Sequence, residues 1–407
     1  MGTENREDVI QETAENLNTV QEVLSPEVFN TSATTQNLRI ATDIEESPFQ
    51  DLYDNEVTIG GYLSDVENLD DTVPLVDPPK TILVVRRGQV LSILMQAFSD
   101  PAIMDKEISI RMRLPNGQIE EGVGPGVFRD CLSEFWNEFY SRCALGTDVK
   151  VPFLRHEFQR NEWQAVARIL AKGWDAVKYF PICLSLPFLE EAVYGTTYSS
   201  VKDSFMHYVA KHERDVFEDA MRNFSSTDHE SLLDVLDSND CHQMPTEENL
   251  PALLDQLGHK ALIQTPMFVI ESWRPILKDL ANTLPPEKLA KIIQEQKPTP
   301  KRVKEILVFP EMMTAQQSCV SRFLKKYIME LDHTTLKNFL RFCTGADLLN
   351  GNRITVNFIE TSDFQCRPQA HTCGCYLMLP LNYQNYPDLR SDFNAVLNSS
   401  VWVMDIV

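Results

Sequence analysis

From residue 81 onward, apolar residues recur at intervals of three and four positions, the spacing that places them on one face of an α-helix. The clearest case runs from Phe128 to Phe139, with Leu132, Phe135 and Trp136 between them on the same face. A stripe of this kind is more typical of core packing than of a ligand site. The same spacing predicts further helices over residues 90–98, 163–174, 320–331, 336–343 and 389–397.

Two other stretches, residues 108–114 and 354–358, alternate between apolar and polar residues, which is the pattern of a strand with one buried face, and a third, residues 376–379, is a short apolar run ended by a proline. Residues 108–114 alternate and lead into Asn116-Gly117, and a second short run follows, so we predict a hairpin here. Residues 354–358 and 376–379 predict two more strands near the C-terminal end. Helices mixed with a few short strands indicate an α+β fold.

Glycines and prolines mark two boundaries in the chain. The loop Gly122–Gly126 precedes the helix at Phe128. It lacks the Lys-Ser/Thr of a phosphate-binding loop, so we interpret it as a tight structural turn. The segment Lys297–Arg302 contains two prolines flanked by basic residues. This composition indicates a linker or hinge, which we place at residues 297–310.

Residues 1–80 differ in composition from the rest of the chain. They hold 18 acidic and three basic residues, a net charge of −15 out of −22 for the whole protein. Such a segment has too little apolar surface to offset the entropy lost on ordering, so we expect an acidic, mostly disordered leader. Two patches that are both apolar and acidic, residues 47–53 and 73–77, are either docking peptides for a partner or parts of a solvated linker.

Composition also narrows the class of protein. At 407 residues and 43% hydrophobic, the chain can bury a sizeable core in two or three domains. Its net charge of −22 argues against nucleic-acid and anionic-membrane partners, because both need a basic surface. We find no signal-peptide pattern and no apolar run of bilayer length. The nine cysteines include no CxxC pair, which indicates reduced thiols and a cytoplasmic or nuclear location.

The strongest chemical signal lies in residues 368–377, where Cys373 follows His371 and Thr372. One interpretation is a zinc site, but three ligands on alternate positions would crowd a structural site. A second is a cysteine hydrolase, which needs a histidine remote in sequence, and none of the other seven lies in a recognisable motif. The four ligand-type residues of the zinc interpretation are Cys366, His371, Cys373 and Cys375.

A third interpretation is exchange between thioesters. This exchange is nearly isoenergetic, so the attacking group needs a thiolate and access rather than a full catalytic triad. In an extended segment residues i and i+2 share a face, which would place His371 beside Cys373. A partly protonated His371 would then favour the thiolate. Cys375 would add a second thiol on that face if the strand continued.

The same segment resembles the active-site signature of HECT-type ubiquitin ligases, in Pro368–Cys373 followed by Leu377–Pro380 and Tyr383. Three further motifs stand in the family's order, and the resemblance covers about residues 81–407. They are Phe339–Gly345, similar to the Phe-x-Thr-Gly motif of the family's C-lobe; Ala167–Gly173, similar to its Gly-Arg-x-x-Gly helix; and Gly122–Asp130, similar to the glycine loop and helix of its N-lobe.

The resemblance implies a bilobal HECT-like fold of the α+β class. A mainly helical N-lobe with short hairpins would span residues 81–305, and a small α/β C-lobe with the catalytic cysteine would span residues 306–407, with a hinge between them. Within the N-lobe, residues 196–265 would form a smaller helical subdomain that docks the ubiquitin-conjugating enzyme. No cofactor and no metal are implied.

By the same resemblance, Cys373 accepts ubiquitin as a thioester and passes it to a lysine of a protein substrate, while His371 and Thr372 position and polarise the site. The implied partners are ubiquitin, the conjugating enzyme and the substrates. An alternative is a catalytically degenerate HECT-fold scaffold that recruits partners through the acidic leader.

Some positions depart from the family's pattern. Asp130 stands where a Glu is usual, Gly374 and Cys375 replace a Phe-Asn pair, and Met404 holds the place of a Phe near the C-terminal end. Loss of the Phe beside Cys373 removes packing next to the thiol. We therefore expect any change in activity to originate at residues 374 and 375.

Overall fold

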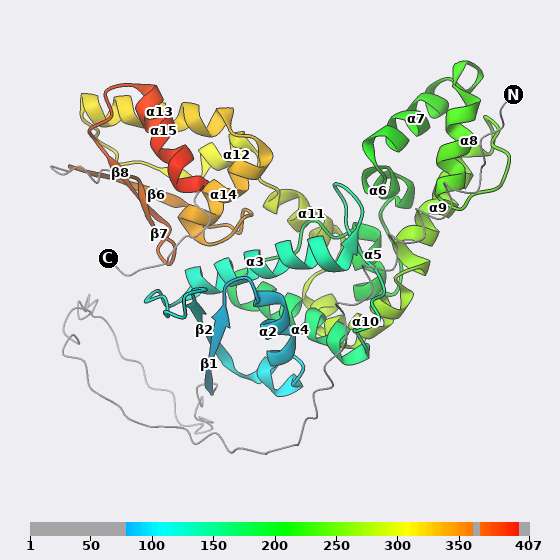
Figure 1. The fold of residues 1–407 in the computed structure, drawn as a ribbon, viewed down its shortest axis with the longest axis horizontal. Helices are drawn as coiled ribbons and strands as arrows, with labels where there is room; N and C mark the ends of the chain where they lie inside the picture. Colours follow the sequence, from blue (N-terminus) through cyan, green and yellow to red (C-terminus); the bar gives the residue numbers. More distant parts are fainter. Residues whose placement is uncertain (1–78, 361–366, 399–407) are drawn as a thin grey trace, which may run out of the picture. The chain divides into compact units, whose positions relative to one another are not determined.

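The computed structural model of this protein describes residues 79–360 and 367–398. Within them, helices are combined with short strands (Figure 1), which confirms the α+β prediction. The buried apolar side chains form two clusters, the first mainly from residues 85–292 and the second from residues 303–397. No helix in these described ranges is long and apolar enough to cross a membrane. The acidic leader up to residue 78 and Met404 lie outside the described residues.

The first cluster includes a two-stranded parallel sheet. β1 (Lys80–Arg86) pairs with β2 (Glu107–Arg113) along its whole length. Parallel strands need a crossover connection, which is supplied here by α2 (Val90–Ala97) and the 3-10 helix η1 (Pro101–Asp105). β1 was not among the predicted strands.

The hairpin predicted after β2 is reduced to a turn. The Gly117 N–H donates to the carbonyl of Leu114, and the Leu114 N–H donates to the carbonyl of Gln118. The returning segment then pairs with β2 through one isolated antiparallel bridge, Arg113 to Ile119. The turn is confirmed, but the predicted second strand is wrong. β2 forms its hydrogen-bonded ladder with β1 instead.

Helices make up the rest of the first cluster. α3 (Pro125–Cys143) and α4 (Arg160–Val177) bury the predicted apolar stripes, and α10 (Met267–Thr283) packs against both α4 and α5. Residues 196–265 contain a separate group of helices, drawn in green in Figure 1. The remaining bounds are α5 (Leu186–Tyr194), α6 (Val201–Tyr208), α7 (Lys211–Arg222), α8 (His229–Ser238), α9 (Leu250–His259), α11 (Pro286–Gln296), β3 (Ala144–Leu145) and β4 (Val151–Pro152).

The second cluster consists of a four-stranded sheet with helices packed on it. The strand order is β5-β6-β8-β7, in which only β7 runs antiparallel to its neighbour. The strands predicted at residues 354–358 and 376–379 are confirmed as β6 and β8. The bounds are β5 (Leu307–Val308), β6 (Ile354–Ile359), β7 (Gln369–His371), β8 (Tyr376–Pro380), α12 (Pro300–Glu305), α13 (Ala315–Glu330), α14 (His333–Thr344) and α15 (Tyr386–Leu397).

The predicted break after residue 296 is confirmed, and it is short. α11 ends at Gln296 and α12 begins at Pro300, because the fixed φ of proline suits the first helical turn. The Thr299 side chain caps α12 by accepting the Arg302 N–H. Beyond α14 the chain touches the first cluster again, where Ala346 and Leu348 are buried.

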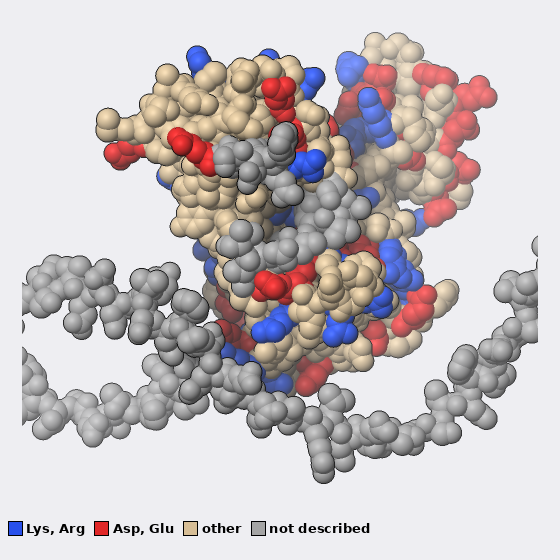
Figure 2. Space-filling view, turned by 60° about the vertical axis from the view of Figure 1, so that its left-hand side comes forward, with Lys and Arg blue, Asp and Glu red and all other residues tan. Residues whose placement is uncertain are grey.

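Charged side chains on the described surface are mixed in sign. On the face that Figure 2 presents, Lys and Arg are interspersed with Asp and Glu, and broad uncharged areas lie between them. Residues 196–265 are distinctly acidic, with 13 acidic and five basic residues. Charge complementarity would therefore favour a partner with basic side chains on this part of the protein.

Candidate active site

Cys373 lies in the turn of a β-hairpin. β7 ends at His371, β8 begins at Tyr376, and these two residues pair across the hairpin. The residues between them, 372–375, are here called the thiol turn. The expectation that His371 and Cys373 share a face of one extended segment is wrong, because the strand ends before Cys373. The turn leaves Cys373 exposed, as a nucleophile requires.

The Cys373 thiol lies against the backbone of the glycine loop. Its Sγ donates a hydrogen bond to the carbonyl of Val123 at 2.9 Å, rather than to His371. A Cβ added to Gly124 would lie 3.3 Å from this Sγ, and Gly124 has a φ of +107°, which residues with side chains rarely adopt. The loop predicted to be only a structural turn therefore forms a wall beside the thiol.

Gly126, in the first turn of α3, touches the backbone of the thiol turn. An added Cβ would lie 2.6 Å from the Cys373 nitrogen and 2.5 Å from Thr372 Oγ1, closer than real Cβ atoms come. A Cβ added to Gly345, directly after α14, would lie 2.2 Å from the carbonyl oxygen of Gly126, and Gly345 has a φ of +81°. Glycine is required at both positions because the two segments meet there backbone to backbone.

Arg129 joins the thiol turn to the end of α14. Its Nη2 donates to the carbonyl of Thr372 and its Nε donates to the carbonyl of Thr344, each at 2.6 Å. The same Nη2 lies 3.6 Å from Cys375 Sγ. Arg129 is only 5% exposed, and this burial lowers its pKa. A guanidinium nevertheless stays protonated in proteins, so a fixed positive charge lies under the turn.

Cys375 is enclosed, in contrast to Cys373. It is 5% exposed and has a left-handed φ of +55°, and its Sγ donates to the carbonyl of Thr372 at 3.6 Å. Burial raises the pKa of the Cys375 thiol, and the charge of Arg129 offsets only part of this effect. The idea of a second thiol on the same face depended on a continuing strand and is wrong. Cys375 is a buried thiol that closes the turn.

Asp130, which replaces the family's usual Glu, joins α3 to the second cluster. Its oxygens accept hydrogen bonds from Arg87 Nη1 at 2.8 Å and from Arg341 Nε at 2.5 Å, and Arg341 belongs to α14. Burial alone would raise the pKa of this 1%-exposed carboxyl, but the charges of Arg341 and Arg87 outweigh burial and lower it. The two arginines also contact Glu120 and Glu134.

Further polar contacts extend along the same side of α3. Ser133 Oγ donates to the carbonyl of Gly345 at 3.0 Å and accepts the Asp347 N–H at 3.1 Å. Asp347 also accepts from Asn137 Nδ2 at 3.1 Å and from the Tyr179 hydroxyl at 2.7 Å. Sequence reasoning missed Ser133, Asn137 and their partners. The polar residues of α3 recur at helical spacing and are here called the polar face of α3: Gly126, Arg129, Asp130, Ser133, Glu134 and Asn137.

An open cavity of about 510 Å³ also borders the glycine loop. Gly124 lies on its wall, so the cavity and the Cys373 thiol share this residue. Three carboxylates line it, from Asp105, Glu107 and Asp175, together with the lysines Lys106 and Lys172, and we call it the acidic groove because the carboxylates are in the majority.

The zinc interpretation gains no support from the described side chains. Cys366 lies outside them, and within residues 79–360 and 367–398 no three His, Cys, Asp or Glu side chains are placed to hold a metal ion. Cys373 faces solvent and the glycine loop, while Cys375 is buried beside Arg129.

Comparison with known families agrees with the motifs. Residues 272–403 match the model of the HECT-domain (ubiquitin-transferase) family. The matched range contains α14, the thiol turn and β8. The resemblance stated above is therefore confirmed, although the glycine loop and α3 lie outside the match. A search of curated proteins gave no significant match.

Proposed function

We propose that this protein is a ubiquitin-protein ligase in which Cys373 carries ubiquitin as a thioester. The family match supports ubiquitin ligase activity in general, and it lends no support to the scaffold alternative. The observation that carries the finer proposal is the exposed Cys373 thiol, held at the tip of a hairpin within the matched range.

Loading of Cys373 is an exchange between two thioesters. The Cys373 thiolate attacks the carbonyl that joins ubiquitin to the conjugating enzyme. A new C–S bond forms, the old one breaks, and the cysteine of the conjugating enzyme leaves as a thiolate that takes up a proton. Because the exchange is nearly isoenergetic, the site must supply access and a thiolate. We assign the positioning and polarising of the thiol to His371 and Thr372.

Transfer to a substrate consumes the thioester. The unprotonated amine of an acceptor lysine attacks the carbonyl, a C–N bond forms, and Cys373 leaves as a thiolate. The extra proton on the nitrogen passes to a carboxylate or to water. We propose that the acceptor lysine arrives through the acidic groove, where the three carboxylates of Asp105, Glu107 and Asp175 outnumber the ammonium groups of Lys106 and Lys172 and so favour a positively charged side chain.

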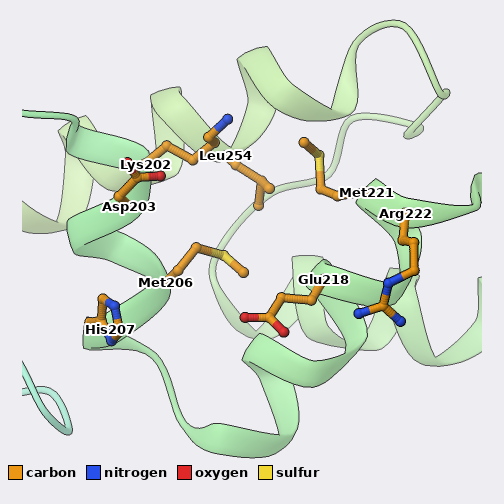
Figure 3. A pocket seen from close by; sticks show the side chains of 8 residues that line it. All are labelled: Lys202, Asp203, Met206, His207, Glu218, Met221, Arg222 and Leu254. Carbon is orange, nitrogen blue, oxygen red and sulfur yellow. The ribbon is translucent and has the colours of Figure 1, made fainter.

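We further propose that residues 196–265 dock the conjugating enzyme. A shallow cavity there is lined by the apolar side chains of Met206, Met221 and Leu254, which Figure 3 shows pointing toward one another from different elements. Charged side chains surround them, among them Lys202 and Glu218. Methionines adapt to the shape of a partner, which suits a surface that must bind and release repeatedly.

The remaining predictions on organisation enter the proposal unchanged. Residues 81–305 would act as the N-lobe and residues 306–407 as the C-lobe, with movement about residues 297–310. The eight cysteines in the described part of the chain are free thiols, which fits the proposed cytoplasmic or nuclear location.

The proposal is tested by charging the protein with ubiquitin and separating the products without reductant. We expect an adduct that thiols destroy, that Cys373→Ser abolishes and that Cys375→Ser retains. Cys375→Ser is the matched control, because it removes the neighbouring thiol and leaves Cys373 in place. If no conjugating enzyme of a broad panel gives such an adduct, the proposal is wrong.

A further inference from the structure

The polar face of α3 holds the thiol turn through main-chain contacts. Gly126 meets the backbone of Thr372 and Cys373, and Arg129 bonds the Thr372 carbonyl. These contacts join a helix of the first cluster to a turn that belongs to the second. The position of the thiol is thus set by residues that precede it by more than 240 positions in the sequence.

Arg129 is the central member of this contact. One guanidinium bonds two carbonyls from separate segments, Thr344 at the end of α14 and Thr372 in the thiol turn. The fixed fork of a guanidinium can satisfy two acceptors at once, whereas the ammonium of lysine is a single point. Because Arg129 is 5% exposed, water has little access to it, and the loss of one of its carbonyl partners would leave a buried N–H donor unsatisfied.

The contacts of Arg129 do not depend on whether Cys373 is free or acylated. Its two partners are carbonyl oxygens, which acylation of the sulfur leaves unchanged. The hydrogen bond from Cys373 Sγ to Val123, by contrast, requires the thiol proton and must be lost in a thioester. The contacts of Arg129 can therefore also hold the thiol turn when Cys373 carries ubiquitin. The Cys373 sulfur, which is then no longer bonded to Val123, remains exposed.

The surroundings of the docked thiol turn suit the transfer of ubiquitin from Cys373 to an acceptor amine. Next to the sulfur the glycine loop has Gly124, which carries no side chain, and Gly124 also borders the acidic groove. An amine at the Gly124 end of that groove would lie next to the same glycine that borders the loaded sulfur. Docked in this way, the thiol turn is open toward an acceptor.

We propose that Arg129 is a positioning residue for ubiquitin transfer: it fixes the thiol turn on α3 so that the loaded Cys373 faces an acceptor amine beside Gly124. This inference rests on the proposed function, because it assumes that Cys373 carries ubiquitin. Arg129 does not touch the reacting atoms, and it acts through the carbonyls of Thr372 and Thr344.

The first test measures docking without ubiquitin, in the full-length protein. Cys375 is the reporter, since docking buries it. We expect Arg129→Met to make Cys375 react with iodoacetamide at least about tenfold faster at neutral pH, because an undocked turn exposes the thiol. Cys343, fully buried in the second cluster, must stay protected, which separates local undocking from unfolding. If Cys375 stays as protected as in the wild type, or if Cys343 is exposed with it, Arg129 does not have this role.

The second test separates loading from transfer in single-turnover reactions. Arg129→Met is expected to slow discharge of the thioester to free lysine by about 10- to 100-fold, the size of effect that misplacement of a reacting group causes, with loading changed far less. Arg129→Lys should recover part of the rate, since it keeps the charge and one hydrogen bond. Arg142→Met is the control, because Arg142 is an exposed arginine near the far end of the same helix.

The outcomes distinguish this inference from the function on which it rests. If the wild-type protein never forms the thioester, the proposed function fails and this inference fails with it. If the wild type loads and Arg129→Met discharges at the wild-type rate, only this inference is overturned. Faster loading of Arg129→Met with an unchanged rate of discharge would likewise overturn it, because the contact of Arg129 would then restrain the unloaded protein instead of assisting transfer.

Discussion

At the residue scale, two cysteines separated by one position have opposite surroundings. Cys373 is exposed beside the glycine loop, whereas Cys375 is buried at a φ of +55° beside Arg129. The sequence contains a clear motif at Cys373, so the candidate nucleophile could be chosen from it, and the structure shows this thiol exposed. The burial of Cys375 could not, because it depends on a strand that stops at His371 and on a side chain from α3.

A glycine at the contact between these segments gives the first prediction. Gly126→Ala would place a Cβ within 2.6 Å of the Cys373 nitrogen, so the thiol turn must move away from α3. We expect a loss of about 1–3 kcal/mol in the free energy of unfolding, measured with urea, as is usual for overpacking.

Gly117→Ala provides the control for this prediction. Gly117 has no atom within 4 Å of an added Cβ, so the substitution tests the cost of a positive φ without a steric clash. Ubiquitin transfer should fall in Gly126→Ala and stay near wild type in Gly117→Ala. Equal transfer rates in the two variants would show that the close approach at Gly126 has no role in the reaction.

At the element scale, α3 is a helix with two buried faces of different chemistry. The apolar face from Phe128 to Phe139 packs in the first cluster, while the polar face binds α14, the thiol turn and the segment after α14. The apolar face was predicted from its spacing. From the sequence alone, the polar face would be expected to face solvent, because nothing within residues 125–143 shows which distant carbonyl groups and arginines cover it.

A buried ion pair on the polar face of α3 gives the second prediction. Asp130→Asn keeps the volume of the side chain but leaves Arg87 and Arg341 without their shared carboxylate. Removing one partner of a buried ion pair usually costs about 3–5 kcal/mol, and we expect a loss of unfolding free energy of this order. Asp219→Asn is the control, because Asp219 pairs with Arg222 on the surface and should change stability by less than about 1 kcal/mol.

The lowered pKa of Asp130 adds a dependence on pH. A carboxyl with a lower pKa in the folded state stabilises the fold above its unfolded pKa of about 4. This contribution is lost as the pH falls through the folded value. The wild type should therefore lose more stability on acidification below about pH 4 than Asp130→Asn does. Parallel stability curves for the two proteins would refute this account of the ion pair.

The strands show where local patterns stop being informative. β6 could be predicted because its residues alternate, β8 because it is a short apolar run ended by a proline, and the helices of the second cluster from their spacing. β1 was missed, and β2 was given the wrong partner. A parallel pair such as β1 and β2 joins segments on either side of a helix, so no turn between them reveals the pairing.

At the scale of the whole molecule, the proposed reaction needs three separate surfaces. Residues 196–265 would receive the conjugating enzyme, Cys373 would carry ubiquitin, and the acidic groove would admit the acceptor. The polar face of α3 joins the two apolar clusters through hydrogen bonds and ion pairs, and Ala346 and Leu348 add a small apolar contact with the first cluster. Polar contacts of this kind can be broken and re-formed during a cycle.

The proposed docking surface gives the third prediction. Met221 is 40% exposed on the cavity in residues 196–265, and Met221→Glu would place a charge among apolar side chains. We expect the KM for the charged conjugating enzyme to rise about tenfold, a loss of roughly 1.4 kcal/mol in binding. The maximal loading rate should stay near wild type, because the site at Cys373 is untouched.

Met312→Glu is the matched control for the docking surface. Met312 is 92% exposed and lies outside residues 196–265, so the same substitution there should leave the KM unchanged. Similar KM values for the two variants would mean that the conjugating enzyme docks elsewhere on the protein.

The central claim is that ubiquitin passes through Cys373, and the most direct measurement is to map the modified residue in a single turnover. The wild-type protein is mixed with a charged conjugating enzyme, quenched in acid and digested without reductant, and the peptides are weighed. The account predicts the C-terminal glycine of ubiquitin on Cys373 as a thioester that disappears when lysine is added. Ubiquitin found on Cys375 or on another cysteine, or on no cysteine while products still form, would contradict it.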